Sequence, residues 1–334
     1  MKILGIETSC DETGVSIYDS NNGVIFNKTY SSKKIHSKYG GVIPELASKN
    51  HIINIIKIIN NIYKKNFYKN IDKIAYTAGP GLFSSLIIGA TIGSTLAYSW
   101  NIDSIPINHL EGHILSPFIE TNNIKFPFVS LLISGGNTQL IYSNKLGKYK
   151  IIGKTVDDAV GEVYDKIANI LGINYPGGKE ISNLAKYGRN IYKFPRPMIN
   201  NNKYKLNFSF SGLKTHIYKL IKKNNNINYQ TKCDIALEFE NSVIDILLKK
   251  CELSIIKTKS KILTVSGGVV SNKNIRNKLL SLENKLKIKV LFPNRKYFTD
   301  NGAMIAYVGY LKSNIIKNNK LNIFVNNKWS LEDI

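Results

Sequence analysis

The chain has 334 residues, of which 43% are hydrophobic and 21% are charged, and its formal net charge is +23. This length and composition are typical of a globular protein of about two domains, and they exclude a disordered chain. The first ten residues, MKILGIETSC, reach Glu7 before any apolar run long enough for a signal peptide, so no export is predicted.

The positive charge has two interpretations. Lysine and arginine neutralise phosphates, so a large surplus of them is typical of a protein that binds nucleic acid. Most of this surplus, however, is lysine scattered among asparagine and isoleucine, as in IIKIINNIYKKNFYKN, a mixture expected from a genome rich in A and T. A basic surface for a nucleic acid and compositional drift on solvated faces both remain open.

The cysteines and the longest apolar stretch predict a soluble protein of a reducing cytosol. Cys10, Cys233 and Cys251 are odd in number and lack CxxC spacing, which favours neither a disulfide framework nor a zinc finger. The apolar stretch 82–100 is interrupted by two glycines and several hydroxyl residues. It therefore predicts a closely packed helix inside the fold rather than a membrane span.

The first elements along the chain alternate between strand and helix. Residues 2–20, KILGIETSCDETGVSIYDS, contain an apolar run, a short polar turn and a second alternating run, which predicts a β-hairpin. Residues 71–81, IDKIAYTAGPG, predict a strand that ends in a Gly-Pro-Gly turn before the helix that starts at Leu82. The alternation indicates the α/β class.

The stretch 107–118, INHLEGHILSPF, has two histidines at helical spacing. His109 and His113 are four residues apart, so on a helix they share one face and can bind one metal ion. A metallopeptidase helix needs its glutamate directly after the first histidine, whereas Glu111 lies about 100° further round the helix. The alternative is a pair of histidines that caps a partly exposed helix end.

Two further glycine-rich turns follow. Residues 126–144, FPFVSLLISGGNTQLIYSN, repeat the hairpin pattern, and residues 261–286 predict a strand, a Ser-Gly-Gly turn and a helix. Glycines let backbone N–H groups approach a ligand closely, and a helix N-terminus favours phosphate. Two hairpins that each open a new α/β half predict a duplicated fold whose lobes hold a nucleotide between them.

Acidic residues mark the predicted helix in 155–172, TVDDAVGEVYDKIANILG. Asp157, Asp158 and Glu162 lie at its start, where the helix dipole favours them. Asp165 lies too far into the helix for that explanation. It is either a carboxylate that accepts hydrogen bonds from a ligand hydroxyl or part of a solvated helix face.

Together these stretches resemble, in order and spacing, the bacterial TsaD family of tRNA threonylcarbamoyladenosine biosynthesis proteins. The matching motifs run from Lys2 to about Trp329 and are ILGIETSCDETG, YGGVIPELAS, AYTAGPGL, NHLEGHILSP, LLISGGNTQL, DDAVGEVYDKIANILG, YPGG, FPRPM, NFSFSGLKT, VSGGVVSN and FTDNGAMIAY. The resemblance implies a duplicated actin-like, Hsp70-like and sugar-kinase-like ATPase fold with two lobes around a nucleotide-binding cleft. We expect 1–107 with about 300–334 as one lobe, and 108–299 with family-specific insertions as the other.

The resemblance also implies an activity and partners. The family transfers a threonylcarbamoyl group from threonylcarbamoyl-AMP to N6 of the adenosine 3′ of the anticodon, in tRNAs that read codons beginning with A. Expected partners are tRNA, a TsaB-like paralogue and a small TsaE-like ATPase, in the cytoplasm and without a membrane. Two other functions stay open: a metallopeptidase, which the family's older name of O-sialoglycoprotein endopeptidase reflects, and a kinase-like ATPase or scaffold.

Carried over to this chain, the family's site residues comprise a metal set, a substrate set and a catalytic pair. The implied ligands of one divalent ion, Fe²⁺ with Zn²⁺ or Mn²⁺ as alternatives, are His109, His113 and Asp300. The implied contacts of the adenylate are Leu132, Ile133, Ser134, Gly135, Gly136, Asp165, Gly178 and Asn272.

The implied catalytic residues are Asp11 and Glu12 in the first hairpin turn, where Glu12 orients or deprotonates the attacking amine. The second turn departs from the family's usual pattern, because Asn137 stands where a histidine is usual.

Overall fold

The computed structural model describes residues 1–121, 123–199, 205–223, 227–315 and 323–334. These residues form two compact units. Unit 1 consists of Met1–Ile124 and Pro293–Ile334, and unit 2 consists of Lys125–Phe292.

Unit 1 is built on a five-stranded sheet with the order β3-β2-β1-β4-β5. Its strands are β1 (Lys2–Glu7), β2 (Glu12–Asp19), β3 (Gly23–Ser31), β4 (Lys73–Gly79) and β5 (Asp103–Asn108). The first three strands are antiparallel neighbours, while β4 runs parallel to β1 and β5 runs parallel to β4. The predicted hairpin over residues 2–20 is confirmed.

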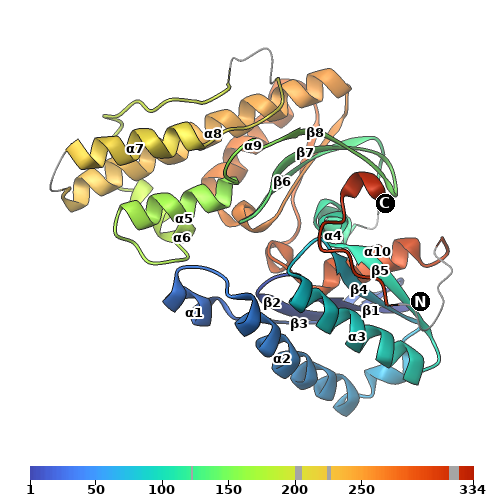
Figure 1. The fold of residues 1–334 in the computed structure, drawn as a ribbon. Helices are drawn as coiled ribbons and strands as arrows, with labels where there is room; N and C mark the ends of the chain where they lie inside the picture. Colours follow the sequence, from blue (N-terminus) through green and yellow to red (C-terminus); the bar gives the residue numbers. More distant parts are fainter. Residues whose placement is uncertain (122, 200–204, 224–226, 316–322) are drawn as a thin grey trace. The chain divides into compact units, whose positions relative to one another are not determined.

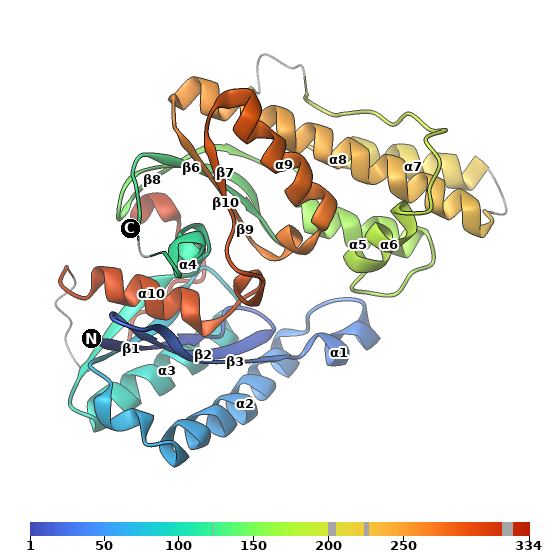
Figure 2. The ribbon, with the colours of Figure 1, turned by 180° about the vertical axis from the view of Figure 1, so that it is seen from behind.

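Helices cover both faces of this sheet, as Figures 1 and 2 show. The helices of this unit are α1 (Lys33–His36), α2 (Pro44–Lys64), α3 (Phe83–Ser99), α4 (His109–Leu115) and α10 (Gly302–Lys312), with short 3-10 turns at Ser37–Tyr39, Phe67–Asn70, Ser116–Phe118, Arg295–Tyr297 and Leu331–Asp333. Side chains alternate along a strand. Gly5 of β1 accordingly faces α10, whereas the next residue, Ile6, faces α3.

Small residues let α10 approach the sheet closely. A Cβ atom on Gly14 of β2 would lie 2.6 Å from the backbone nitrogen of Gly302, so this position has no room for a side chain. α3 packs in a similar way, because Gly93 lies against Tyr76. The prediction of a closely packed helix after Leu82 is therefore confirmed, and none of the described helices combines the length and hydrophobicity that a transmembrane segment requires.

Unit 2 repeats the connectivity of unit 1. Its strands are β6 (Phe128–Ile133), β7 (Thr138–Lys145), β8 (Lys148–Lys154), β9 (Ile262–Ser266) and β10 (Lys289–Leu291), and their order is β10-β9-β6-β7-β8. β6 pairs antiparallel with β7 and parallel with β9, as β1 does with β2 and β4. The predicted duplication is therefore present in both sheets.

The helices of unit 2 are α5 (Val160–Ile170), α6 (Gly178–Ala185), α7 (Ser211–Lys223), α8 (Tyr229–Thr258) and α9 (Lys273–Leu286), with a 3-10 turn at Gly268–Ser271. α5 begins at Val160, so Asp157 and Asp158 precede the helix instead of lying in its first turn. Asp157 caps another helix instead: its carboxylate accepts hydrogen bonds from the backbone N–H groups of Phe210 and Ser211 at the start of α7.

The boundary between the units differs from the expected one. Residues 108–124 belong to unit 1, although the sequence suggested that the second lobe starts at residue 108. The reason is the packing of α4 against α10, where a Cβ atom on Gly112 would lie 3.1 Å from Cγ of Met304. This contact joins segments that are far apart in the sequence.

Candidate functional site

The two histidines of the HLEGH stretch lie on α4, which starts at the end of β5. Asn108 caps this helix, because its side-chain oxygen accepts hydrogen bonds from the N–H groups of Leu110 (2.9 Å) and Glu111 (3.3 Å). All seven residues of α4 are buried. The predicted helical spacing of His109 and His113 is confirmed, and the alternative of a partly exposed helix end is wrong.

Asp300, which precedes α10, meets both histidines. Its Oδ1 atom lies 3.0 Å from Nε2 of His113 and 3.7 Å from Nε2 of His109. One potential ligand atom from each of the three residues lies within 4.8 Å of the others. The three predicted ligands thus come together in unit 1, as a cluster of two imidazoles and one carboxylate.

A second carboxylate orients His109. Nδ1 of His109 lies 3.0 Å from Oε2 of Glu7, which also accepts a hydrogen bond of 2.6 Å from the hydroxyl of Thr77. A carboxylate behind a ligating histidine fixes its ring and tautomer in many metal sites. Here it turns Nε2 of His109 toward Asp300, so these residues fit a divalent metal whose ligands are nitrogen and oxygen.

The charges in this cluster support one another. Burial by itself disfavours a charged imidazole, yet the carboxylates of Glu7 and Asp300 raise the pKa of His109 to about 9. Burial likewise opposes ionisation of both carboxylates, but the neighbouring histidines lower the pKa of Glu7 and that of Asp300. A bound cation would provide the same counter-charge while requiring neutral imidazoles.

Glu111 is not part of the cluster of His109, His113 and Asp300. Its Oε2 atom lies 2.6 Å from Nζ of Lys312 on α10, and both side chains are buried. A buried ion pair of this kind is costly to break. The glutamate therefore anchors α4 to α10 and does not supply the general base that a metallopeptidase would need.

The first hairpin turn is rich in buried polar atoms. Among the described residues, Oγ1 of Thr8, Oγ of Ser9 and Oδ2 of Asp11 have no hydrogen-bond partner. Unsatisfied buried polar groups are rare in native proteins and commonly mark a ligand site. Sequence reasoning singled out Asp11 in this turn but missed Thr8 and Ser9.

Glu12, the second predicted catalytic residue, is paired with a lysine. Nζ of Lys33 on α1 donates a hydrogen bond of 2.6 Å to its Oε1. Burial and the charge of Asp300 raise the pKa of Glu12, although Lys33 opposes the shift. Burial works against the charge of the lysine too, but Glu12 outweighs it and raises the pKa of Lys33 to about 12.

In unit 2, both predicted glycine-rich turns leave the same edge of the sheet. β6 and β9 are parallel, with Leu132 opposite Ser266, so the turns that follow them are neighbours. Gly267 has a φ of +95° and passes directly over the backbone oxygen of Ile133, where a Cβ atom would collide with it. The carboxyl ends of parallel strands are the usual ligand edge of an α/β sheet.

The start of α5 closes one side of the turn at 134–137. The N–H group of Gly161 donates to the backbone oxygen of Ser134 (3.2 Å), and a Cβ atom on Gly161 would lie 2.6 Å from that oxygen. Gly135 and Gly136 are exposed, and no described atom lies within 4 Å of where their Cβ atoms would be. The turn therefore presents bare backbone to its surroundings.

The remaining predicted contacts gather at the starts of α6 and α9. Oδ1 of Asp165 accepts a hydrogen bond of 2.8 Å from the N–H group of Gly177, which directly precedes Gly178. The side chain of Asn272 caps α9 and donates to Ser182 on α6 (2.9 Å). The hydroxyl oxygen of Ser182 also lies 3.1 Å from the carbonyl oxygen of Gly178. The predicted role of these residues in binding a nucleotide stays a prediction.

Asn137 closes the second turn through short-range contacts. Its carbonyl oxygen accepts from the N–H group of Ser134 (2.9 Å), and its side-chain oxygen accepts from Nε2 of Gln139 (3.3 Å). The side chain is half-buried. The side chain of Asn137 therefore stabilises the turn and is also partly accessible at the surface.

Two units with the same strand connectivity, each opening with a hairpin and a polar turn, have the duplicated fold of actin-like ATPases. Full-length HypF in a phosphate- and nucleotide-bound form is similar, with a TM-score of 0.62 and 15% identity over 94% of this chain and 56% of that one. Component A of the (R)-2-hydroxyglutaryl-CoA dehydratase of Acidaminococcus fermentans is similar too, with a TM-score of 0.53 and 14% identity over 92% of this chain and 96% of that one. These likenesses support the fold alone.

Sequence comparison narrows the class to a family. A family model described as "TsaD: tRNA N6-adenosine threonylcarbamoyltransferase" matches residues 23–307. A relative of that name from Wigglesworthia glossinidia brevipalpis is 52% identical over 337 residues, which cover 100% of this chain and 98% of the relative. Another relative of that name, from Buchnera aphidicola subsp. Schizaphis graminum, is 49% identical over 100% of this chain and 99% of the relative. The chain belongs to the TsaD family.

Proposed function

We propose that this protein is a tRNA N6-adenosine threonylcarbamoyltransferase, which attaches a threonylcarbamoyl group to N6 of an adenosine in tRNA. The observation that carries the proposal is the 52% identity to a relative with that name over the whole chain. The finer substrate assignment is the adenosine 3′ of the anticodon, in tRNAs that read codons beginning with A.

We further propose threonylcarbamoyl-AMP as the donor, held by unit 2. The exposed backbone of Gly135 and Gly136 lies at the carboxyl end of β6, where N–H groups can meet phosphate oxygens. Asp165 and Gly178 lie at the start of α6, where a carboxylate can accept hydrogen bonds from ribose hydroxyls. These positions support an adenylate as the ligand.

The reaction is an acyl transfer from a mixed anhydride, so charge develops on the carbonyl oxygen and on the departing phosphate. Fixed N–H donors and a cation at those atoms lower the barrier. The N–H groups of the turn at 134–136 would provide such donors. The exocyclic amine of adenosine is a weak nucleophile, so we assign to Glu12, held by Lys33, the task of orienting it or accepting its proton.

We propose that His109, His113 and Asp300 hold one divalent ion, with Fe²⁺ as the first candidate and Zn²⁺ or Mn²⁺ as alternatives. When bound, such an ion supplies Lewis-acid stabilisation of negative charge. Glu7 keeps His109 in the orientation that ligation requires. The orphaned hydroxyls of Thr8 and Ser9 and the carboxylate of Asp11 are further polar groups for a substrate in this unit.

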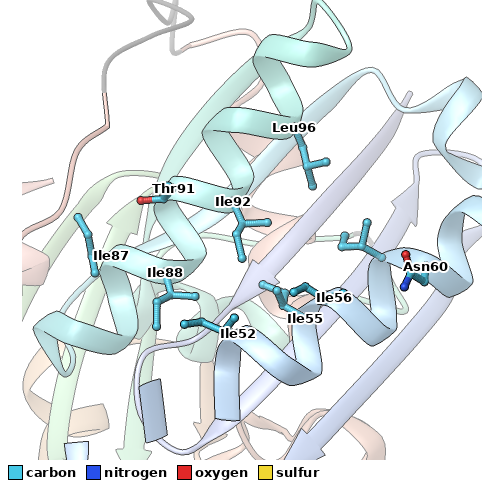
Figure 3. Close-up of a pocket in the computed structure, with 10 residues that line it drawn as sticks. Ile52, Ile55, Ile56, Asn60, Ile87, Ile88, Thr91, Ile92 and Leu96 are labelled. Carbon is cyan, nitrogen blue, oxygen red and sulfur yellow. The ribbon is translucent and has the colours of Figure 1, made fainter. Parts of the chain in front are cut away.

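We propose the outer face of α2 and α3 as the binding surface for a TsaB-like paralogue. These helices border an apolar groove of about 500 Å³, lined by Ile52, Ile55, Ile56, Ile87 and Ile88 among others (Figure 3). Ile52, Ile56 and Ile87 are all exposed in this groove, and a patch of neighbouring exposed apolar side chains commonly marks a protein–protein interface. Replacing Ile56 and Ile87 with glutamate should abolish co-elution with the paralogue, and unchanged co-elution would exclude this face.

The net charge of +23 supports tRNA as the substrate, because lysine and arginine neutralise phosphates, and we propose the cytoplasm as the location of the reaction. A small TsaE-like ATPase is the third expected partner. The arrangement of Glu111 gives the metallopeptidase no support, since its carboxylate is bound to Lys312.

The decisive experiment is mass analysis of tRNA nucleosides after incubation of the purified protein with unmodified tRNA, synthetic threonylcarbamoyl-AMP and the two partners. The transferase produces threonylcarbamoyladenosine. A scaffold or a kinase-like ATPase would leave the tRNA unmodified, whether or not it hydrolyses added ATP, and a metallopeptidase would cleave an added protein substrate in a chelator-sensitive way. Either of those results, with no modified nucleoside, would overturn the proposal.

A further inference from the structure

A buried carboxylate lies behind the predicted nucleotide contacts of unit 2. Glu240 on α8 is 1% exposed and accepts three side-chain hydrogen bonds. Its Oε1 accepts from Ser182 (3.0 Å) and Asn272 (2.6 Å), and its Oε2 accepts from Asn274 (2.6 Å). In the described part of the chain it forms no ion pair, so neutral donors alone offset the cost of its burial.

These bonds fix the side-chain amide of Asn272. Its oxygen accepts from the N–H groups of Asn274 (2.9 Å) and Ile275 (3.1 Å), as a helix cap does. Its nitrogen donates to Glu240 and Ser182. A flipped amide would place its oxygen against the oxygens of Glu240, so only one orientation satisfies every group.

The same carboxylate joins two helix starts. Ser182 lies on the first turns of α6 and connects Glu240 to this helix, and Asn272 connects Glu240 to the start of α9. Tyr164, which precedes Asp165 on α5, contacts the cluster as well: its hydroxyl oxygen lies 3.4 Å from the side-chain nitrogen of Asn272. Burial and the adjacent charge of Glu240 raise the pKa of Tyr164. One carboxylate thus organises the segments that carry Asp165, Gly178 and Asn272.

We propose that Glu240 is the positioning residue of the nucleotide site in unit 2. It does not touch the ligand; it sets the spacing and orientation of the starts of α6 and α9, on which Gly178 and Asn272 lie. An apolar residue could fill the same volume but would remove an acceptor from the side chains of Ser182, Asn272 and Asn274. The inference rests on the proposed function, because it takes an adenylate with free ribose hydroxyls as the ligand.

The test is Glu240→Gln, which keeps the shape but replaces one acceptor oxygen with a donor nitrogen. We measure by calorimetry the binding of a non-hydrolysable threonylcarbamoyl-AMP analogue and of its 2′-deoxy form to the full chain. The Kd of the ribose analogue should rise about tenfold, the scale of one lost hydrogen bond to a charged group. The preference for ribose over deoxyribose should fall, and this ratio does not depend on how much of the protein is folded.

Glu238→Gln is the matched control. Glu238 lies on the same helix, is 3% exposed and accepts hydrogen bonds from the N–H group of Phe194 and the guanidinium of Arg196. It is bonded to a different loop, so its replacement should lower stability and leave the ribose preference unchanged. An equal loss of that preference in both variants would mean that Glu240 has only a structural role, and the proposal would be overturned.

A second variant, Asn274→Ala, applies if Glu240→Gln does not fold. Asn274 is exposed and is not a predicted nucleotide contact, and its loss leaves Oε2 of Glu240 without this donor. The ribose preference should then fall about threefold, a fraction of one hydrogen bond. Wild-type preference in this variant would overturn the inference, whereas a wild-type protein that ignores both analogues would refute the proposed donor itself.

Discussion

The candidate metal centre of unit 1 and the glycine-rich turns of unit 2 are constructed in opposite ways. The metal centre consists of side chains, and each is held by another: Glu7 holds His109, and Asp300 contacts His113. The turn at 134–136 is backbone with no side chain at two of its three positions, and the space around Gly135 and Gly136 is open. The candidate metal centre depends on the side chains that are present, whereas the turn depends on the absence of side chains.

This difference predicts different responses to mutation. Substitution at the metal centre should remove function by removing donor atoms, even where the fold tolerates the change. Substitution at the turns should act through added volume, and its effect should depend on whether protein or ligand occupies the space.

The largest effect is expected at the candidate ligands. His113→Ala or Asp300→Ala should reduce bound metal and transfer by more than about 100-fold, because changes to groups behind the ligands alone cost about 10- to 100-fold in many sites. Glu7→Gln should reduce bound metal and transfer by about 10- to 100-fold, since it keeps the ligands and loses only the orienting carboxylate. Metal content by mass spectrometry, with circular dichroism for folding, distinguishes these cases. Full metal occupancy in a His109→Ala, His113→Ala double variant would contradict the assignment.

An intermediate effect separates two glycines of unit 2. Gly161→Ala should lower the free energy of unfolding by about 1–3 kcal/mol, because its Cβ atom would lie 2.6 Å from the oxygen of Ser134. Gly135→Ala meets no described atom within 4 Å, so stability should change by less than about 0.5 kcal/mol. Adenylate affinity should nevertheless fall in Gly135→Ala. Unchanged affinity by calorimetry would mean that the ligand does not lie against this turn.

The smallest effect is expected for Asn137→His, which restores the family's usual residue. The imidazole can replace the amide as a hydrogen-bonding group, while Gln139 exchanges its amide acceptor for a ring nitrogen. Transfer should be unchanged or modestly higher, within about 1 kcal/mol, and should become more dependent on pH between about 6 and 7, where an unperturbed imidazole titrates. The comparison is the transfer rate against pH for both proteins. A folded, metal-loaded but inactive variant would show that this turn is adapted to asparagine.

Local pattern predicted much of the fold. Alternating residues around short polar turns predicted both hairpins, and the Ser-Gly-Gly turn predicted the strand and helix on either side of it. The boundary in the structure differs from the one expected at residue 108 because α4 packs on α10 as well as on the end of the first sheet. No periodicity within 108–124 signals a neighbour that lies so much later in the chain.

The candidate site shows the same limit. The spacing of His109 and His113 is local and was visible, whereas Asp300 lies 187 residues after His113 and came only from the family resemblance. Glu7 and Glu240 were missed, although each is a charged residue within a buried stretch. That signal marks a polar group that needs a partner, but its partners come from residues such as Thr77 and Asn272, at sequence separations of 70 and 32.

The discontinuity of unit 1 has a consequence for biosynthesis. His109 and His113 leave the ribosome early, but Asp300 and the helix that packs on α4 follow only after all of unit 2 has been made. At typical translation rates of about 5–20 residues per second, the 187 residues between His113 and Asp300 take about 10–40 s. During that interval the nascent chain exposes a histidine pair without its carboxylate, so a prematurely terminated product would lack the complete ligand set even if unit 2 had folded.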